Sequence, residues 1–241
     1  MEFVIMLKRS EINRSIEIAR RVFAANGLHL PEFAFRSVAE WDRAGHECDE
    51  IRDCMLGWDV TDFGSGDFRK TGRTLFTLRN GRRNDPRYPK SYAEKFILDP
   101  DFQCAPAHFH RSKREDIINR GKGFIVLELT ASDPDGNPAG GSLTVAVDGI
   151  SRTIPSGSRV RLKPGESICL VPGTIHQFWG EGPDGILIDG ERYGVSGEVS
   201  SVCDDISDNV FIHGGNRFPG IDEDEEKICY LCNEYPAASA D

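Results

Sequence analysis

Apolar and polar positions follow two different patterns along this chain, one typical of helices and one typical of strands. Between residues 10 and 26, apolar residues repeat at helical spacing and charged residues occupy the opposite face. The apolar positions of this segment are Ile12, Ile16, Ala19 and Phe23. An Asn-Gly pair then supplies a helix-ending signal, and Ser37 with Glu40 has the spacing of a capping box that begins a second helix. The pattern predicts a helical extension over residues 1–58.

After residue 92 the rhythm changes to short strand-like segments separated by turns rich in Gly, Pro and Asp. The predicted strands cover residues 95–98, 107–110, 123–130, 142–148, 151–154, 159–162, 166–171, 176–179 and 185–189. No helical pattern interrupts this series. It therefore favours an antiparallel sandwich or barrel over a parallel α/β fold.

Shorter signals mark the two ends of the chain. The apolar start, residues 1–8, predicts a short strand or a packed arm, and residues 210–212 and 228–231 predict added strands in the tail. An acidic run at 222–226 is typical of a solvated turn. We predict one mainly β domain over residues 1–241. Its parts are the helical extension (1–58), a barrel core (93–200) and C-terminal strands with a tail (201–241).

Composition narrows the possible partners. The 241 residues are 39% hydrophobic and 9% aromatic, as expected of a chain that folds around a core. The net charge of -10, from 29 basic and 39 acidic residues, disfavours binding to nucleic acid or to an anionic membrane surface. No apolar run approaches the roughly 20 residues that span a bilayer. A neutral substrate or a metal cation fits this charge better than a polyanion.

The seven cysteines predict a reducing environment. Their number is odd and their spacing irregular, and the first residues carry an early acid without a basic leader or a cleavage site. We therefore expect free thiols in a cytoplasmic protein. Cys229 and Cys232 have the spacing of a zinc or redox pair, but no second pair accompanies them, and buried structural cysteines are the favoured interpretation.

Candidate chemistry begins with a His-x-His motif. On a strand, His108 and His110 point to the same face, and Glu115 can return a carboxylate to that face from a turn or the next strand. Two imidazoles and one carboxylate suit a divalent transition metal and leave positions open for substrate oxygens.

A second motif leads to His176. Gly165 ends a turn, an apolar strand follows, and Pro172-Gly173 bends the chain before His176 begins the next strand. That hairpin could place His176 beside the first three groups. Each motif alone fits ordinary exposed or hydrogen-bonded histidines, whereas the combination favours a metal site.

These two stretches resemble the paired motifs of the cupin superfamily, small β-barrels of jelly-roll type with a metal inside. The resemblance implies four ligands, matched residue by residue to His108, His110, Glu115 and His176. The sequence departs from the usual motifs in two ways. The stretch from Gly165 to Pro172 is one residue longer than usual, and no Asn follows His176 at the customary place. Neither departure affects a ligand.

A narrower resemblance is to bacterial D-lyxose isomerases. It is carried by EDIINRG (115–121), RLKPGES (161–167), FWGEG (178–182), GEVSSV (197–202) and LCNEYP (231–236). These segments extend beyond the cupin motifs into the tail. The resemblance implies a manganese-dependent enzyme that interconverts D-lyxose and D-xylulose, with D-mannose and D-fructose as a second pair. A homodimer is expected because cupin sheets commonly pair edges or faces.

Isomerisation of this kind also requires a group that moves protons. Our candidates are Glu198, then Lys113 and Asp205. Each has an ordinary alternative: a surface ion pair for Glu198, simple exposure for Lys113 and an Asx turn for Asp205. A metal-assisted hydride shift would need no base at carbon.

Two other functions share these ligands. An iron-dependent cupin dioxygenase would use the same four side chains. A sugar-binding cupin without activity is the second alternative, although such proteins often lose ligands and this chain keeps all four. A phosphosugar isomerase would need free cations, for which the sequence offers Arg82, Arg83, Lys90 and Arg111.

Overall fold

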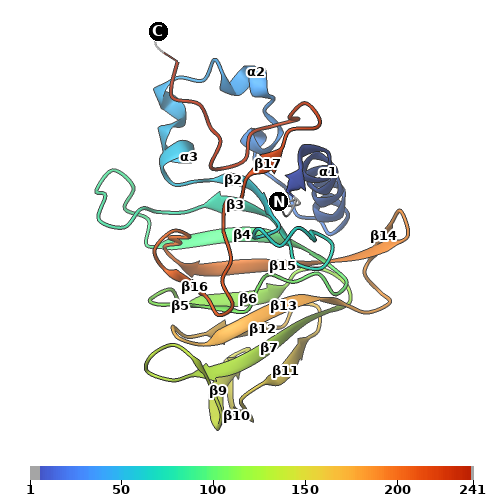
Figure 1. Cartoon of the computed structure of the whole chain (residues 1–241), viewed down its shortest axis with the longest axis vertical. Coiled ribbons are helices and arrows are strands. Elements are labelled where there is room, and N and C mark those ends of the chain that lie inside the picture. Colours follow the sequence, from blue (N-terminus) through green and yellow to red (C-terminus); the bar gives the residue numbers. More distant parts are fainter. Residues whose placement is uncertain (1–5, 240–241) are drawn as a thin grey trace, which may run out of the picture.

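A computed structural model describes residues 6–239, which form two curled antiparallel sheets and one short parallel pair of strands, with helices at one end (Figure 1). The strands are β1 Leu7–Lys8, β2 Gly57–Thr61, β3 Arg73–Arg79, β4 Tyr92–Pro100, β5 His108–His110, β6 Glu115–Asn119, β7 Phe124–Ser132, β8 Pro138–Ala139, β9 Ser142–Val147, β10 Ile150–Pro155, β11 Ser158–Leu162, β12 Ser167–Leu170, β13 Ile175–Glu181, β14 Ile186–Ile188, β15 Glu191–Ser201, β16 Asn209–Phe211 and β17 Ile221–Asp222. The helices are α1 Arg9–Ala25, α2 Val38–Trp41 and α3 Asp49–Asp53, with 3-10 turns at Glu32–Phe35 and His46–Cys48.

The larger sheet has the strand order β10-β9-β12-β6-β15-β4-β3-β2, with β14 attached to β15. The smaller sheet has the order β11-β7-β13-β5-β16, with β8 attached to β7. Their inner faces pack together through Leu75, Ile97, Ile117, Ile125, Leu127, Leu129, Ile168 and Phe178. The mainly β, cupin-type barrel with an N-terminal helical extension is therefore confirmed.

Most of the predicted elements are present. The amphipathic helix is α1, the capping box of Ser37 begins α2, and each of the nine segments predicted between residues 95 and 189 overlaps a strand. Residues 210–212 overlap β16, and the predicted first strand is present in part as β1, while residues 1–5 lie outside the described part of the chain.

The strand predicted at residues 228–231 is wrong. The backbone there bonds to other partners, because the N–H of Ile228 donates to the Asn13 side chain at 3.3 Å and the N–H of Cys232 donates to the carbonyl of Trp58 at 2.7 Å. Cys229 and Cys232 are both buried and free.

The longest strand, β15, was not predicted. Its sequence, ERYGVSGEVSS, mixes glycine, serine and charge, so it lacks the apolar alternation of a half-buried strand. It is nonetheless central, because β4 pairs on one side and β6 on the other. Gly197 allows this packing, since a Cβ there would meet the Arg120 side chain at 3.1 Å.

Helix α1 packs on the outer face of the larger sheet through its apolar stripe, with Ile16, Phe23 and Trp58 buried in one cluster (Figure 1). Its first residue, Arg9, is fully buried and pairs with Glu223 at 2.7 Å and Glu234 at 2.5 Å. The acidic run of the tail is exposed, but it also anchors this helix. No helix within residues 6–239 has the length and hydrophobicity to cross a membrane.

Replacing Arg9 should test this link between the two chain ends. Arg9→Ala leaves Glu234 without its guanidinium in a partly buried place, so we expect the free energy of unfolding to fall by about 2–3 kcal/mol. The exposed pair Arg161–Glu181 provides the control, because Arg161→Ala should change stability by less than about 0.5 kcal/mol. Urea unfolding of both variants makes the comparison, and equal losses would contradict it.

Candidate metal centre

The three motif histidines converge inside the barrel from two neighbouring strands. His108 and His110 project inward from β5, and His176 lies directly opposite His108 on β13. The ring centroids of His108 and His176 are 4.4 Å apart, and each of these two rings lies 5.2–5.5 Å from His110. One ligand atom from each ring lies within 4.8 Å of the others.

Glu115 reaches the same point from β6 of the opposing sheet. Its Oε1 lies 2.9 Å from Nε2 of His176 and 3.4 Å from Nε2 of His110. The backbone orients two of the rings, because Nδ1 of His108 bonds the carbonyl of Pro106 at 2.8 Å and Nδ1 of His176 bonds that of Thr174 at 2.9 Å. These bonds leave both Nε2 atoms free to act as ligands.

The protonation states favour a cation at this point. Burial lowers the pKa of His108 well below its ordinary value and also lowers that of His110, so their lone pairs are available. Burial opposes ionisation of Glu115, but Lys113 and the nearby histidines outweigh it and hold the pKa of this carboxyl well below its usual range. Both ring nitrogens of His110 and Oε1 of Glu115 are buried without a hydrogen-bond partner. A divalent ion would satisfy Nε2 of His110 and Oε1 of Glu115, so the residues fit a metal.

The candidate proton-transfer groups lie beside the four predicted ligands. Lys113 is buried, and its Nζ lies 2.7 Å from both Glu115 Oε2 and Glu198 Oε1. Glu198 is also buried, on the inner face of β15, so its alternative as a surface residue is wrong. Asp205 lines the same cavity and accepts a hydrogen bond from Asn209 at 3.2 Å. All seven residues named from the sequence therefore come together.

Several cavity residues were not anticipated from the sequence. Lys95 lies directly opposite Glu198 in the β4–β15 register, with its Nζ 3.6 Å from Glu198 Oε2 and 3.9 Å from Asp205 Oδ2. Arg73 pairs with buried Asp99 at 2.9 Å. Arg217 arrives from the C-terminal segment and pairs with Asp59. Lys95 and Arg73 could have been predicted, because each is a basic residue in a strand that also carries buried apolar residues. No sequence pattern marks Arg217.

Opposite charges hold the cavity lysines in their ionised form. Burial alone would lower the pKa of Lys113, but Glu115 and Glu198 raise it well above its ordinary value. Burial also opposes ionisation of Glu198, yet Lys113 and Lys95 lower the pKa of this carboxyl. The cavity thus contains carboxylates and ammonium groups in contact, beside neutral imidazoles.

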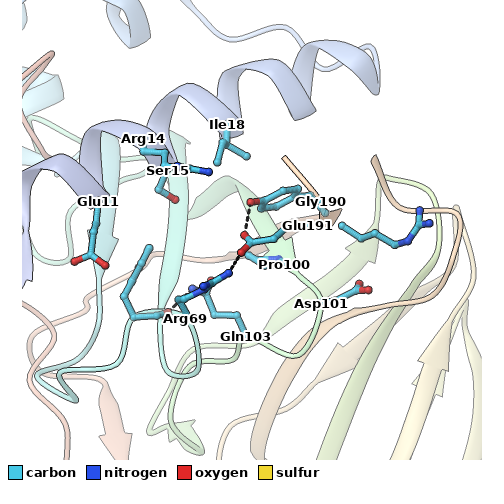
Figure 2. A pocket seen from close by; sticks show the side chains of 13 residues that line it. Glu11, Arg14, Ser15, Ile18, Arg69, Pro100, Asp101, Gln103, Gly190 and Glu191 are labelled. Carbon is cyan, nitrogen blue, oxygen red and sulfur yellow. Dashed lines mark hydrogen bonds and ion pairs between the residues drawn. The ribbon is translucent and has the colours of Figure 1, made fainter. Parts of the chain in front are cut away.

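A second hollow, of about 680 Å³, lies on the outer surface between α1, the 62–72 loop and the β14–β15 hairpin (Figure 2). Glu191 at its centre bonds the Tyr193 hydroxyl at 2.8 Å and pairs with Arg69. It contains no histidine or cysteine, and its central arginine already faces a carboxylate. The candidate chemistry therefore lies in the inner cavity.

Comparison with known proteins identifies the family. The sequence model of D-lyxose isomerase matches residues 7–235. The chain belongs to the D-lyxose isomerase family. It is 47% identical to the D-lyxose/D-mannose isomerase of Escherichia coli O157:H7 over 232 residues, which cover 95% of this chain and 98% of that protein. The enzyme of the same name from Serratia proteamaculans is 45% identical over 231 residues, with the same coverage. This member of the family is a sugar isomerase.

Solved structures agree on the fold. The L-ribose isomerase of Cellulomonas parahominis, with L-psicose, superposes with a TM-score of 0.53 at 14% identity and covers 90% of this chain and 99% of its own. The L-ribose isomerase of Geodermatophilus obscurus gives a TM-score of 0.53 at 13% identity, with the same coverage. At this identity the likeness shows the barrel fold of this chain and nothing further.

Removing one predicted ligand should strongly weaken metal binding by this protein. His108→Ala takes away one of three converging imidazoles, so we expect affinity for Mn²⁺ to fall by at least about 100-fold. His213 is exposed and lies outside the cavity, so His213→Ala should bind like the wild type. Isothermal titration of metal-stripped protein measures both, and unchanged binding in His108→Ala would disprove the site.

Proposed function

We propose that this protein interconverts D-lyxose and D-xylulose, and D-mannose and D-fructose, with a divalent metal held by His108, His110, Glu115 and His176. The observation that carries the proposal is the convergence of these four side chains beside the buried pair Lys113–Glu198. The names of the two relatives, D-lyxose/D-mannose isomerase, support the choice of sugars.

Each side chain has a role that its surroundings support. A divalent ion held by the three histidines and Glu115 would supply polarisation of the sugar carbonyl and stabilisation of negative charge on oxygen. Glu198, ionised beside two lysines, takes the proton from C2 of the open-chain aldose and returns it to C1. The proton of the C2 hydroxyl passes to the C1 oxygen in the same reaction, and the two transfers together produce the ketose. Lys113 donates a hydrogen bond to the sugar oxygen whose charge changes, and Lys95 keeps Glu198 ionised. Asp205, held near Lys95, binds a hydroxyl group further along the sugar.

The charges of the cavity support a free sugar over a phosphosugar. Its four lysines and arginines each contact a buried carboxylate: Lys95 with Glu198, Lys113 with Glu115, Arg73 with Asp99 and Arg217 with Asp59. A phosphate would have to displace one of those carboxylates. None of the four cations that kept the phosphosugar alternative open lines the cavity, namely Arg82, Arg83, Lys90 and Arg111.

We further propose that the metal is manganese, that the protein is located in the cytoplasm and that it forms a homodimer. A carboxylate with three imidazoles accepts Mn²⁺ among other divalent ions, and a reducing compartment suits the seven free cysteines. The dimer is proposed because cupin sheets commonly pair through their edges or faces. Light scattering during gel filtration measures the oligomeric state.

The metal requirement has a direct assay. Protein stripped with EDTA should convert neither D-lyxose nor D-mannose, and manganese should restore ketose formation because the ion stabilises charge on the sugar oxygens. The ketose is measured by chromatography, and stripped protein reloaded with Mg²⁺ controls for metal identity. Stoichiometric manganese without turnover of either sugar would reject the isomerase and direct the test to oxygen uptake with iron.

The role of Glu198 separates proton transfer from a hydride shift. Glu198→Gln keeps the shape but cannot accept a proton, so we expect kcat to fall by about 10²–10⁴-fold with manganese still bound. Glu128→Gln, on the outside of the barrel, is the matched control. Turnover in D₂O provides the second measurement: proton transfer introduces deuterium at C1 of the ketose. A deuterium-free product and nearly wild-type kcat in Glu198→Gln would favour the hydride shift.

A further inference from the structure

The turn between β5 and β6 is held by a residue that lies far away in the sequence. Asp208, just before β16, is buried, and its Oδ1 accepts hydrogen bonds from the backbone N–H of Ser112, at 2.9 Å, and from the Ser112 hydroxyl. Its Oδ2 accepts from the backbone N–H of Lys113 at 3.0 Å. Its own carbonyl accepts from the N–H of Arg111 at 3.0 Å. One residue thus bonds three consecutive positions of the turn.

The same carboxylate faces the one predicted ligand ring that the backbone does not orient. Oδ2 of Asp208 lies 3.8 Å from Nδ1 of His110, about 1 Å beyond hydrogen-bond distance. Nδ1 of His110 has no hydrogen-bond partner, whereas the other two rings each bond a backbone carbonyl. The remaining charged neighbour of Asp208 is Arg83, at 3.7 Å from Oδ1. A carboxylate behind a ligand imidazole fixes the ring and raises its basicity.

The position of this turn determines where Lys113 lies. Its Nζ must contact Glu115 and Glu198 at once, each at 2.7 Å. A displacement of about 1 Å would break one of these contacts, and misplacements of that size are costly in catalysis.

We propose that Asp208 is a positioning residue of this site, which places Lys113 for the reaction and orients His110 for the metal. The first part rests on the proposed function, and the second part requires only that the site binds a divalent ion.

The experiment compares Asp208→Asn with Asp148→Asn. Asp148 is a matched control, because in an exposed turn it accepts hydrogen bonds from the N–H and hydroxyl of Ser167, at 2.8 and 2.9 Å. An asparagine at 208 keeps one acceptor oxygen of the two and loses the charge. We expect the dissociation constant for Mn²⁺ to rise about 10–100-fold in Asp208→Asn and to be unchanged in Asp148→Asn. At saturating Mn²⁺, kcat on D-lyxose should fall at least tenfold while KM changes less than twofold.

Ser112→Ala provides a second variant that retains the fold, because Ser112 is exposed. It removes one hydrogen bond to Asp208, so we expect a fall in kcat of roughly fivefold. In the double variant this loss should not add to that of Asp208→Asn, because both changes release the same turn.

Equal metal affinity and kcat in Asp208→Asn and Asp148→Asn would overturn the proposal. If Asp208→Asn does not fold, wild-type behaviour of Ser112→Ala overturns it instead. A wild-type protein that binds Mn²⁺ but converts neither sugar rejects the proposed function, and the Mn²⁺ dissociation constants still decide the role of Asp208 toward His110.

Discussion

Charge neutralisation inside the barrel is the constraint on which the rest of the site depends. Glu115, Lys113, Glu198 and Lys95 form a continuous buried chain of alternating charge. A buried charge without its partner would cost several kcal/mol of folding free energy. None of these four side chains can therefore be buried in its charged form unless its neighbour is present. The chain begins on β6 and crosses β15 and β4 of the larger sheet, while the histidines lie on the smaller one. The larger sheet therefore satisfies these charges among its own neighbouring strands, and the smaller sheet adds the histidines where the two sheets close on each other.

The sequence predicted the local part of this arrangement well. A strand alternates its side chains, so His-x-His places two imidazoles on one face wherever the strand lies, and a Pro-Gly turn before His176 marks the next strand. These are properties of neighbouring residues. The barrel was likewise readable from the regular spacing of turns. Lys113 was named because it lies between two of the predicted ligands in the sequence. Glu198 was named because it lies in a segment beyond the barrel motifs that has no apparent structural need for an acid. The structure adds the contact between them.

What could not be predicted depends on which strands pair. Glu198 faces Lys95 only because β15 lies against β4 in one particular register, and a slip of one residue would turn it outward. The sequence of β15 hides its central position, since glycine and serine replace the apolar residues expected there. Arg217 and Asp208 come from a segment without regular pattern. The failed strand at 228–231 has the same origin, since its apolar residues pack under α1 rather than in a sheet.

The short strand β5 has an implication for how the protein is made. It has only three residues, shares one register pair with β13 and gains its other edge from β16. Strand β16 leaves the ribosome about 100 residues after β5, which at typical rates of synthesis takes roughly 5–20 seconds. During that interval the histidines of β5 lie on an unpaired edge that other chains or stray metal ions can reach. The nascent chain therefore needs protection at this edge until the C-terminal segment has emerged and β16 can pair with β5.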